Sequence, residues 1–461
     1  MGKFDQIYEH SPVWMQNAMV STYGIYWYWL RFGGSYRSHL REYKHREWQT
    51  AEQWQQYTQA QLNRLLSIAY QHVPYYRANW SQSEFSSAMN DGLEYLPLLE
   101  KAPLREDPHQ FCRQDQKPFP KLVFHTSGTT GTPIQSIWNI SEMRNALALR
   151  EARSVNWAGV SFKQPRATFS GRMIEPDPEQ DTHIYRFNSV ENQVYFSAFH
   201  LKPHTAHRYV QALRKHKVVW LTGYAVSFYL LAKFILEQDI PVPNLQAVIT
   251  TSEKLSPEMR KVMEAAYRCK IYEEYSTVEN AVFASECEHG SLHVSPDASF
   301  IEIIKPDGSA CNPGEIGEVV TTCLMRAYQP LIRFRLGDLA AWDDKPCSCG
   351  RQMPVIKEVV GRIEDVVIGP DGRQLVRFHG IFTDQPNIVE GQIIQETLSD
   401  FTVKVVPTSA FNQSDILEIK IRMHQRLGSN VSIAVKLVSA IKRTESGKYK
   451  GVVSKLKSQA K

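Results

Sequence analysis

The chain lacks the features that mark secreted, membrane-spanning and disordered proteins. Its 461 residues include only seven cysteines, too few for the disulfide framework of a small secreted domain, so we expect a reducing, cytoplasmic environment. Residues 1–6 show no basic start followed by an apolar core, which argues against a signal peptide. No internal repeat or low-complexity tract stands out, and 43% of the residues are hydrophobic, enough to build several packed cores.

Long apolar runs are also scarce. The longest largely apolar stretch, residues 218–236, is interrupted by Gly223 and Lys233, and it predicts a strand, a turn and an amphipathic helix rather than a membrane span. The aromatic stretch at residues 23–30 is too short to span a bilayer. We expect it to pack against the protein's own body, and contact with a membrane surface or a partner is the alternative.

The chain carries little net charge, and that charge is unevenly placed. It has 53 Lys and Arg against 48 Asp and Glu, a net charge of +5. Residues 442–461 hold seven Lys and Arg against Glu445 alone, which leaves a net charge of −1 for the first 441 residues. Because a nucleic-acid footprint needs basic residues spread over one face, we expect no nucleic-acid partner.

Composition and residue spacing divide the sequence into three parts. Residues 1–115 are polar, aromatic and helical in spacing, and residues 116–361 alternate short β-branched runs with helical stretches. That alternation predicts an α/β layered sheet. Residues 362–461 contain short segments typical of a small α+β domain.

Local patterns sharpen this division. A capped helix start is predicted within residues 48–52 (WQTAE), and apolar residues then recur at helical spacing. The predicted strands are residues 218–221, 247–250, 401–406 and 416–421.

A glycine-rich loop is the first candidate for ligand binding. Residues 126–133 read TSGTTGTP and follow a strand-like run, so backbone N–H groups and hydroxyls there can donate to phosphate oxygens. No lysine follows the second glycine, which excludes the loop of P-loop NTPases. A hydroxyl-rich surface turn is the alternative for the loop taken alone.

Together with five later segments, this loop resembles the adenylate-forming superfamily of acyl-CoA synthetases, adenylation domains and luciferase. The later segments follow the family's order: residues 250–255 (TTSEKL), 275–279 (YSTVE), 334–338 (FRLGD), 361–365 (GRIED) and 443–448 (RTESGK). Residues 69–77 resemble the phenylacetate-CoA ligase-like branch. The pairs Ser11-Pro12 and Gln16-Asn17 are similar to its subgroup associated with capsular polysaccharide.

The resemblance implies a large N-terminal domain of layered sheets and helices and a small, mobile α+β C-terminal domain that hinges at Glu364. It implies an ATP-dependent carboxylic acid ligase that forms an acyl-adenylate and then a coenzyme A thioester, serving surface or capsular polysaccharide biosynthesis. One alternative is an amide ligase that acylates an amino sugar or amino acid. Another is an inactive scaffold in a polysaccharide assembly complex, so peripheral contact with assembly proteins is expected.

Residue roles follow from the same resemblance. Lys448 is expected to reach the carboxylate and α-phosphate, Glu279 to bind Mg²⁺, and Arg362 to lie near the ribose and α-phosphate. Asp338 is expected to accept from the ribose hydroxyls, and Tyr275 to stack on adenine. The expected nucleotide-binding set is Thr126, Ser127, Gly128, Thr129, Thr130, Gly131, Ser252, Glu253, Lys254, Tyr275, Ser276, Thr277 and Asp338.

Three positions depart from the family pattern. Ile134 stands where many members place a phosphate-binding lysine, and Ser276 replaces a glycine. Val278 occupies the place of a hydroxyl that contacts the α-phosphate, for which Thr277 is a substitute. These changes bear on the rate and on the strength of nucleotide binding.

A second group of residues predicts a metal site. Cys347-Ser348-Cys349-Gly350 resembles a metal knuckle, and a third cysteine and one histidine complete a tetrahedral zinc set. The expected ligands are Cys287, His293, Cys347 and Cys349, with His293 preferred to His289 by resemblance to related ligases. Four protein ligands make such a zinc structural, and ordinary unligated thiols are the alternative.

The acid-binding pocket is predicted between residues 196–200, residues 223–227 and the end of the Glu274 strand. His200, Tyr224, Ala225 and Glu274 are its expected residues, and they favour a small apolar or aromatic carboxylic acid. Plain core packing explains the same residues equally well.

Overall fold

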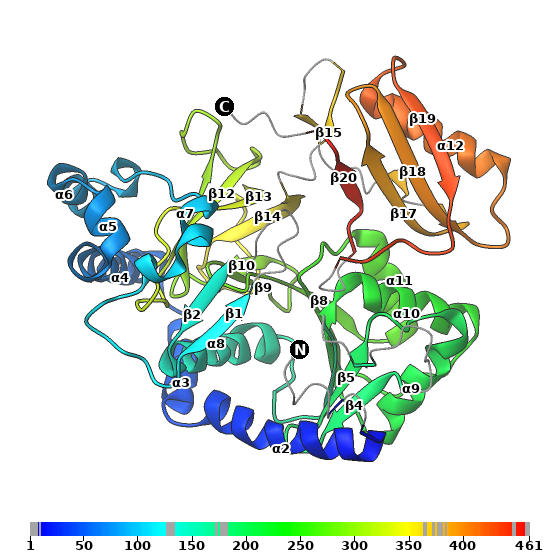
Figure 1. The fold of residues 1–461 in the computed structure, drawn as a ribbon, viewed down its shortest axis with the longest axis horizontal. Helices are drawn as coiled ribbons and strands as arrows, with labels where there is room; N and C mark the ends of the chain where they lie inside the picture. The colour runs from blue at the N-terminus through cyan, green and yellow to red at the C-terminus, as the bar shows by residue number, and fades with distance from the viewer. Residues whose placement is uncertain are drawn as a thin grey trace.

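The computed structural model describes residues 8, 11–125, 134–170, 174–175, 183–362, 367–370, 374–375, 381–382, 385–444 and 449–456. A large body is built on one long sheet, and a smaller sheet-and-helix unit from the C-terminal part of the chain lies beside it (Figure 1). This mixed α/β arrangement confirms the predicted fold class.

Helices dominate the first part of the chain. They are α2 (Val13–Phe32), α3 (Tyr36–Arg46), α4 (Ala51–His72), α5 (Pro74–Asn79), α6 (Gln82–Asn90) and α7 (Lys101–Glu106), with short 3₁₀ turns at Leu93–Tyr95 and Pro108–Phe111. The predicted start of α4 is confirmed, because Thr50 Oγ1 accepts from Gln53 N and Gln53 Oε1 accepts from Thr50 N. Its Leu62, Leu65 and Ala69 are buried in the core shared with the sheet.

A β-hairpin and a helix with a π-helical end follow in the chain. Strands β1 (Leu122–His125) and β2 (Gln135–Trp138) pair antiparallel. Helix α8 (Ile140–Arg150) then continues into a π-helical turn, Glu151–Val155. Arg153 in this turn is fully buried and meets Asp297 at 3.3 Å, so an internal ion pair holds the turn in place.

The large sheet has the strand order β11-β12-β13-β14-β10-β9-β8-β7-β6-β3-β5-β4. Strands β5, β3, β6, β7 and β8 run parallel, and the remaining neighbours pair antiparallel. The strands are β3 (Arg166–Ser170), β4 (Tyr185–Asn188), β5 (Gln193–Ser197), β6 (Trp220–Tyr224), β7 (Ala247–Thr251), β8 (Lys270–Ser276), β9 (Phe283–Glu286), β10 (Leu292–Val294), β11 (Ser299–Ile304), β12 (Gly317–Cys323), β13 (Phe334–Trp342) and β14 (Val355–Arg362).

The parallel strands read as apolar runs because both of their faces are covered. Every residue of β5 and of β6 is buried, as expected where helices pack on both faces of a sheet. The connecting helices are α9 (Ala206–Lys215), α10 (Ala225–Glu237) and α11 (Pro257–Tyr267), with a 3₁₀ turn at Pro203–Thr205. This pattern confirms the predicted strands at residues 218–221 and 247–250 to within three residues.

Residues 218–236 form β6, a turn and α10, as predicted, rather than one long helix. Gly223 makes the close packing possible, since a Cβ there would lie 2.0 Å from the Phe169 carbonyl oxygen of β3. Among the described residues, no helix is long and apolar enough to cross a membrane.

The C-terminal unit has its own sheet and core. Strands β17 (Ile388–Gln395), β18 (Asp400–Pro407), β19 (Ser432–Leu437) and β20 (Val452–Ser454) lie in the order β19-β18-β17-β20, and α12 (Gln413–Leu427) packs on them through Ile419 and Met423. The two-stranded pair β15 (Val367–Ile368) and β16 (Gln374–Leu375) precedes it. The predicted strand at residues 401–406 is confirmed as β18.

The predicted strand at residues 416–421 is wrong, because this segment belongs to α12. Asn412 and Asp415 form a reciprocal capping box at the helix start. Ile419 and Met423, four residues apart, are buried, whereas Leu417 and Ile421 are exposed. The apparent alternation therefore came from exposed apolar residues on a helix.

Candidate active site

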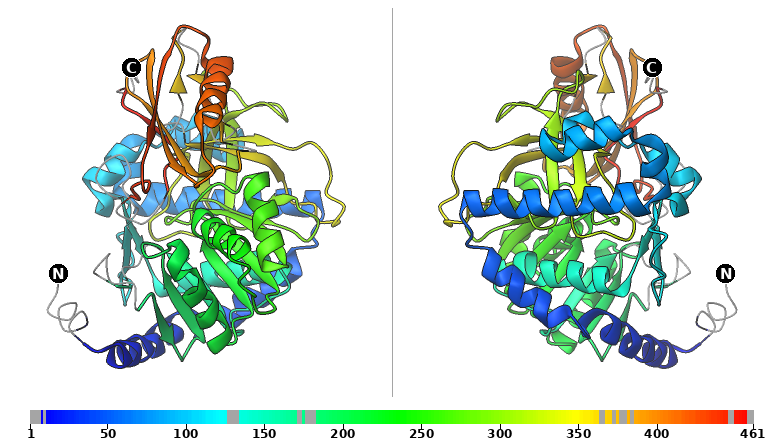
Figure 2. Two further views of the ribbon diagram at one scale, coloured as in Figure 1. Left: turned by 90° about the vertical axis from the view of Figure 1, so that its right-hand side faces the viewer. Right: turned by 90° about the vertical axis from the view of Figure 1, so that its left-hand side faces the viewer.

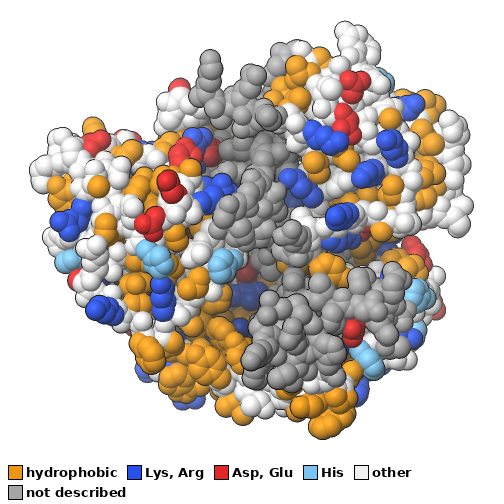
Figure 3. Space-filling model, viewed as in Figure 1, with side chains coloured by type: hydrophobic (Ala, Val, Ile, Leu, Met, Phe, Trp, Pro, Cys, Tyr) orange, Lys and Arg blue, Asp and Glu red, His pale blue; other side chains and the backbone are white. Residues whose placement is uncertain are grey.

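A cavity of about 1360 Å³ opens between the large body and the C-terminal unit. Its lining comes from the carboxyl ends of β7 and β8, from β13, β14, α2, α8, α10 and α11, and from segments beside β17 and β20. Ligands of parallel α/β sheets bind at this edge of the strands. Lys and Arg side chains gather on the visible face of the C-terminal unit (Figure 3), which suits a negatively charged ligand.

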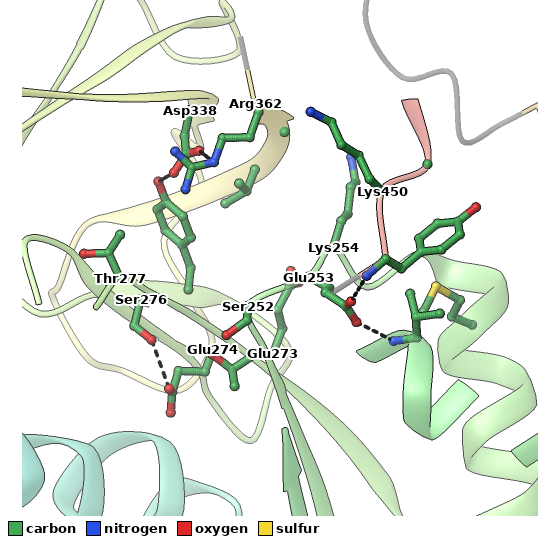
Figure 4. Close-up of a pocket in the computed structure, with 18 of the residues that line it drawn as sticks. Ser252, Glu253, Lys254, Glu273, Glu274, Ser276, Thr277, Asp338, Arg362 and Lys450 are labelled. Carbon is green, nitrogen blue, oxygen red and sulfur yellow. Dashed lines mark hydrogen bonds and ion pairs between the residues drawn. The ribbon is translucent and has the colours of Figure 1, made fainter. Parts of the chain in front are cut away.

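Tyr275, Asp338 and Arg362 form one hydrogen-bonded group on the cavity wall. Tyr275 Oη donates to Asp338 Oδ2 at 2.7 Å, and Arg362 Nε lies 2.9 Å from Asp338 Oδ1 (Figure 4). Asp338 and Arg362 are also register partners in the β13–β14 ladder. Burial, with the charge of Asp338, raises the pKa of Tyr275 well above its ordinary value, so its hydroxyl stays protonated and donates.

Glu274 lies on the same wall in a second polar group. Its Oε2 meets Arg150 Nε at 2.7 Å, and Ser276 Oγ donates to its Oε1 at 3.1 Å. Arg150 Nη2 also donates to Thr222 Oγ1 at 2.9 Å. The sequence analysis missed Arg150, which lies in α8, outside every motif and without a local signal.

The rest of the predicted Tyr-x-Thr-x-Glu segment also lines the cavity. Thr277, Val278 and Glu279 follow the end of β8, with Glu279 buried and Val278 exposed. Arg326 Nη1 donates to the Glu279 carbonyl oxygen at 2.8 Å, which fixes the backbone at this point. The expected roles of these residues in metal and phosphate binding stay predictions.

Glu253 joins the two parts of the molecule. Its Oε2 accepts from the backbone N–H of Val226 at 2.9 Å, at the start of α10. Its Oε1 accepts from the backbone N–H of Tyr449 at 2.8 Å, in the C-terminal unit (Figure 4). One carboxylate of the large body therefore holds the residue that directly follows Lys448 in the chain.

The neighbours of Glu253 also lie at the cavity. Lys254 Nζ contacts Glu358 Oε1 at 2.9 Å and the Val360 carbonyl oxygen at 3.3 Å, which ties this loop to β14. Ser252 is exposed and lines the cavity.

Further contacts come from the C-terminal unit. Lys233 Nζ of α10 donates to the Ile388 carbonyl oxygen at 2.9 Å, and burial lowers the pKa of Lys233. The Tyr449 hydroxyl donates to the Gly391 carbonyl oxygen. Sequence reasoning missed Tyr449, although its position next to Lys448 was a usable signal.

Glu273 is a further titratable group of the cavity lining that the sequence analysis missed. Burial, then the charge of Glu286, raises the pKa of Glu273 to about 7. Glu286 itself is ion-paired with Arg260 at 2.7 Å.

Some predicted residues lie outside the described part of the chain. They are Thr126, Ser127, Gly128, Thr129, Thr130, Gly131, Glu364 and Lys448.

Of the four residues expected in the acid pocket, Glu274 lines the cavity. His200 is fully buried, with its Nδ1 2.6 Å from Ser197 Oγ, and Tyr224 and Ala225 are buried where β6 passes into α10. These three are not among the described residues that line the cavity. Their packing matches the interior alternative raised from the sequence.

Cys287, His293, Cys347 and Cys349 come together away from this cavity. One ligand atom from each lies within 4.8 Å of all the others. Cys287 Sγ is 3.6 Å from Cys347 Sγ, and Cys349 Sγ is 3.4 Å from His293 Nε2. His289 is not in this set, and its ring instead contacts Ser348.

The surroundings of the cluster orient its members. The backbone N–H of Cys349 donates to Cys347 Sγ, and that of His289 donates to Cys287 Sγ, both at 3.4 Å. His293 Nδ1 is 3.3 Å from the Met353 carbonyl oxygen, which leaves Nε2 directed at the cluster. The cluster thereby joins the β9–β10 pair to the connection between β13 and β14.

Comparison with known proteins matches this architecture. A family model described as the CapK C-terminal domain matches residues 367–455. Over 475 aligned positions the chain is 23% identical to Protein CapK of Staphylococcus aureus, covering 98% of this chain and 99% of that protein. It is 27% identical over 130 residues to a phenylacetate-coenzyme A ligase of Thermus thermophilus, covering 27% of this chain and 29% of the ligase.

Solved structures share the fold. A 2-hydroxyisobutyryl-CoA ligase in its postadenylation state superposes with a TM-score of 0.69 at 20% identity, covering 89% of this chain and 91% of the ligase chain. The same ligase in its thioesterification state superposes with a TM-score of 0.55 at 21% identity, again covering 89% of this chain and 91% of the ligase chain. The chain therefore shares the fold of these adenylate-forming ligases, is similar to Protein CapK along its length, and matches the CapK C-terminal domain over residues 367–455.

Proposed function

We propose that the chain is an AMP-forming acid ligase that activates a small carboxylic acid with ATP and then transfers the acyl group to coenzyme A. The observation that carries this proposal is the Tyr275–Asp338–Arg362 group at the carboxyl edge of the sheet, facing a C-terminal unit that docks through Tyr449. It supplies carboxylate, phenol and guanidinium groups in one cavity.

In adenylation, a carboxylate oxygen attacks the α-phosphorus of ATP and pyrophosphate leaves, so negative charge gathers on phosphate oxygens. Donors and cations fixed in advance around that charge lower the barrier. In our proposal Arg362 and Lys448 supply cations, and Asp338 accepts from the ribose. Glu279 holds Mg²⁺, whose charge neutralises the phosphates.

Several observations support the acceptor and the biological setting that we propose. Two relatives carry coenzyme A ligase names, namely the Thermus thermophilus protein and an acyl-CoA ligase of Bacillus subtilis at 23% identity over 132 residues. The likeness to Protein CapK extends over the whole chain and supports a role in surface or capsular polysaccharide biosynthesis.

Carboxylate-dependent exchange of labelled pyrophosphate into ATP tests the first half-reaction. A panel of small acids should identify one that supports exchange, and Lys448→Ala should abolish it while the exposed-lysine control Lys436→Ala should not. Mass spectrometry of the product with coenzyme A or with amino sugars then separates thioester from amide formation. No exchange with any acid of a broad panel would reject the ligase and favour a scaffold.

We also propose that the Cys/His cluster holds a structural zinc ion. Zn–S bonds of about 2.3 Å and a Zn–N bond of about 2.0 Å imply tetrahedral edges of about 3.8 Å between sulfurs and about 3.5 Å between sulfur and nitrogen. The separations of 3.6 Å and 3.4 Å fit those edges. Elemental analysis of purified protein should show one zinc per chain.

A further inference from the structure

Helix α2 turns several polar side chains inward, beside buried Leu30, and exposes most of its aromatic side chains. It lies at the edge of the large body opposite the C-terminal unit (Figures 1 and 2). A helix that only covers a sheet normally buries its apolar face. The reversed arrangement of α2 therefore requires an explanation from outside the chain.

The inward face of α2 is polar because it covers an edge strand, β4. Asn17 Oδ1 accepts from the Phe187 backbone N–H at 2.9 Å, and Ser21 Oγ accepts from the Ser189 N–H at 3.1 Å. Gln16 Oε1 accepts from Arg186 Nε of the same strand. These bonds satisfy backbone and side-chain groups that an edge strand would otherwise expose.

The outward face is apolar and aromatic. Trp14 is 73% exposed, Ile25 60% and Trp29 59%. The remaining large exposed side chains of the helix are Met15, Tyr23, Tyr26 and Tyr28. Together they cover more than half of the helix circumference, which is wider than the stripe that a single partner helix would bury. Hydrophobic side chains gather along the same lower edge in the space-filling view (Figure 3).

The residue types of this face match the interface of a lipid bilayer. Trp and Tyr prefer the level of the lipid head groups, where the ring is buried and its polar atom is hydrated. The eighteen residues from Val13 to Leu30 include no Lys, Arg, Asp, Glu or His. No charged group of this stretch would therefore have to enter the apolar layer.

Positive charge flanks the aromatic face. Between Val13 and Arg46 the chain has five Lys and Arg side chains and a single acidic one, Glu42. Arg37, Arg41 and Lys44 of α3 are exposed. On the other side, exposed Lys215 shares a groove with Asn17 and Ser21 of α2. This charge distribution complements an anionic lipid surface.

We propose that α2 docks the protein on the surface of an anionic phospholipid bilayer, with its aromatic face at the level of the head groups. The helix lies in the plane of the interface and does not cross it. The C-terminal unit lies at the opposite edge of the molecule and stays in water, whereas Trp27 and Arg31 of α2 line the cavity between the docked edge and that unit.

Sedimentation with vesicles tests the proposal. The full chain should bind vesicles of phosphatidylcholine mixed with phosphatidylglycerol, and bind them more tightly than vesicles of phosphatidylcholine alone. The triple variant Trp14→Ser/Tyr26→Ser/Trp29→Ser should weaken binding by about 10-fold or more, because it removes the penetrating rings. Arg37→Gln/Arg41→Gln/Lys44→Gln should remove the preference for phosphatidylglycerol and the sensitivity to salt.

Controls separate docking from misfolding and from other partners. Tyr95→Ser and Leu417→Ser remove comparably exposed apolar side chains elsewhere and should leave vesicle binding unchanged. The triple variant should keep the Tm of the wild type. Absence of binding to the mixed vesicles, or unaltered binding by the triple variant, would overturn the proposal. So would sedimentation velocity that shows a wild-type dimer and a monomeric triple variant, since α2 would then join two copies of the chain.

Discussion

The two walls of the cavity are built differently. On the large body, Asp338 and Glu274 each use both carboxylate oxygens for side-chain partners, and those partners come from several strands and from α8. The C-terminal unit meets this body through bonds to backbone groups, from Glu253 to the Tyr449 N–H and from Lys233 to the Ile388 carbonyl.

This difference suits the wall of the large body to ligand binding and the C-terminal unit to movement. A wall of mutually fixed charged groups keeps its shape before a ligand arrives, which is what stabilisation of developing charge requires. A few bonds to backbone groups can break and form again without rearranging a network, as a domain that closes and opens needs. We expect substitutions on the wall of the large body to remove activity. Substitutions at the contact with the C-terminal unit should change adenylation and acyl transfer to different extents.

The largest effect is expected at Asp338. Asp338→Asn keeps the shape but loses the charge that pairs with Arg362 and one of the two acceptors. Hydrogen bonds to charged groups contribute about 1.5–3 kcal/mol, so exchange of pyrophosphate should fall by about 10- to 100-fold. Asp344→Asn, an exposed neighbour, is the matched control. Unchanged exchange by Asp338→Asn would show that the first wall is not a binding wall.

A second prediction concerns the support of that wall. The β13–β14 hairpin carries Asp338 and Arg362 at one end and the Cys347–Cys349 turn at the other. Cys347→Ser should lose the zinc and lower the Tm by about 5 °C or more, because metal binding is coupled to folding. Elemental analysis and thermal unfolding measure both effects. Cys269→Ser, outside the cluster, should change neither, and retention of zinc by Cys347→Ser would exclude the proposed site.

The third prediction concerns Glu253, which holds the C-terminal unit against the large body through Tyr449. In Glu253→Gln, one acceptor oxygen becomes an NH₂ group that faces a backbone N–H, so the docking of Tyr449 weakens. We expect exchange of pyrophosphate to fall by about 10-fold, the value of one such bond, with a smaller change in acyl transfer measured from isolated adenylate. Glu264→Gln on α11 is the control. Equal loss in both half-reactions would place Glu253 with the fixed wall instead.

The smallest effect concerns pH. Because the pKa of Glu273 is raised from 4.5 to about 7, the folded state holds this proton at pH values where the unfolded chain has lost it. The unfolding free energy should therefore decrease as the pH rises from about 4.5 to about 7, and stay lowered above. Glu273→Gln should remove this component and raise the Tm at pH values above that window by a few degrees. Glu106→Gln should follow the wild type, and an unchanged pH profile in Glu273→Gln would contradict the assignment.

Much of the cavity was predictable because its motifs sit at strand ends. The segments around Tyr275, Asp338 and Arg362 were located by their resemblance to motifs of the adenylate-forming superfamily, and pairing of the strands brings them together. The cysteines of the Cys/His cluster were found from their residue types, and His293 from a resemblance to related ligases. Local capping chemistry was enough to predict a helix start within residues 48–52, where α4 begins.

The features that the sequence did not predict depend on contacts between distant segments. Arg150 reaches Glu274 only because α8 packs beside β8, and Glu253 meets Tyr449 only when the two parts of the molecule come together. Arg150 leaves no local pattern, and the position of Tyr449 next to Lys448 does not reveal its contact with Glu253. For residues 416–421, exposed Leu417 and Ile421 obscured the helical spacing of the buried residues. The aromatic run at residues 23–30 was expected to pack against the protein's own body, but five of its eight residues, Tyr23, Ile25, Tyr26, Tyr28 and Trp29, are exposed.

The π-helical turn after α8 sets the tolerance of this region to changes in length. Arg150 before the turn reaches Glu274 in the cavity wall, and Arg153 within it reaches Asp297 in the interior. Each helical residue adds about 100° of rotation, so deleting one residue from Glu151–Val155 would restore regular α-helical winding and turn one arginine away from its carboxylate. Homologous chains that keep both ion pairs should therefore keep the number of residues between them.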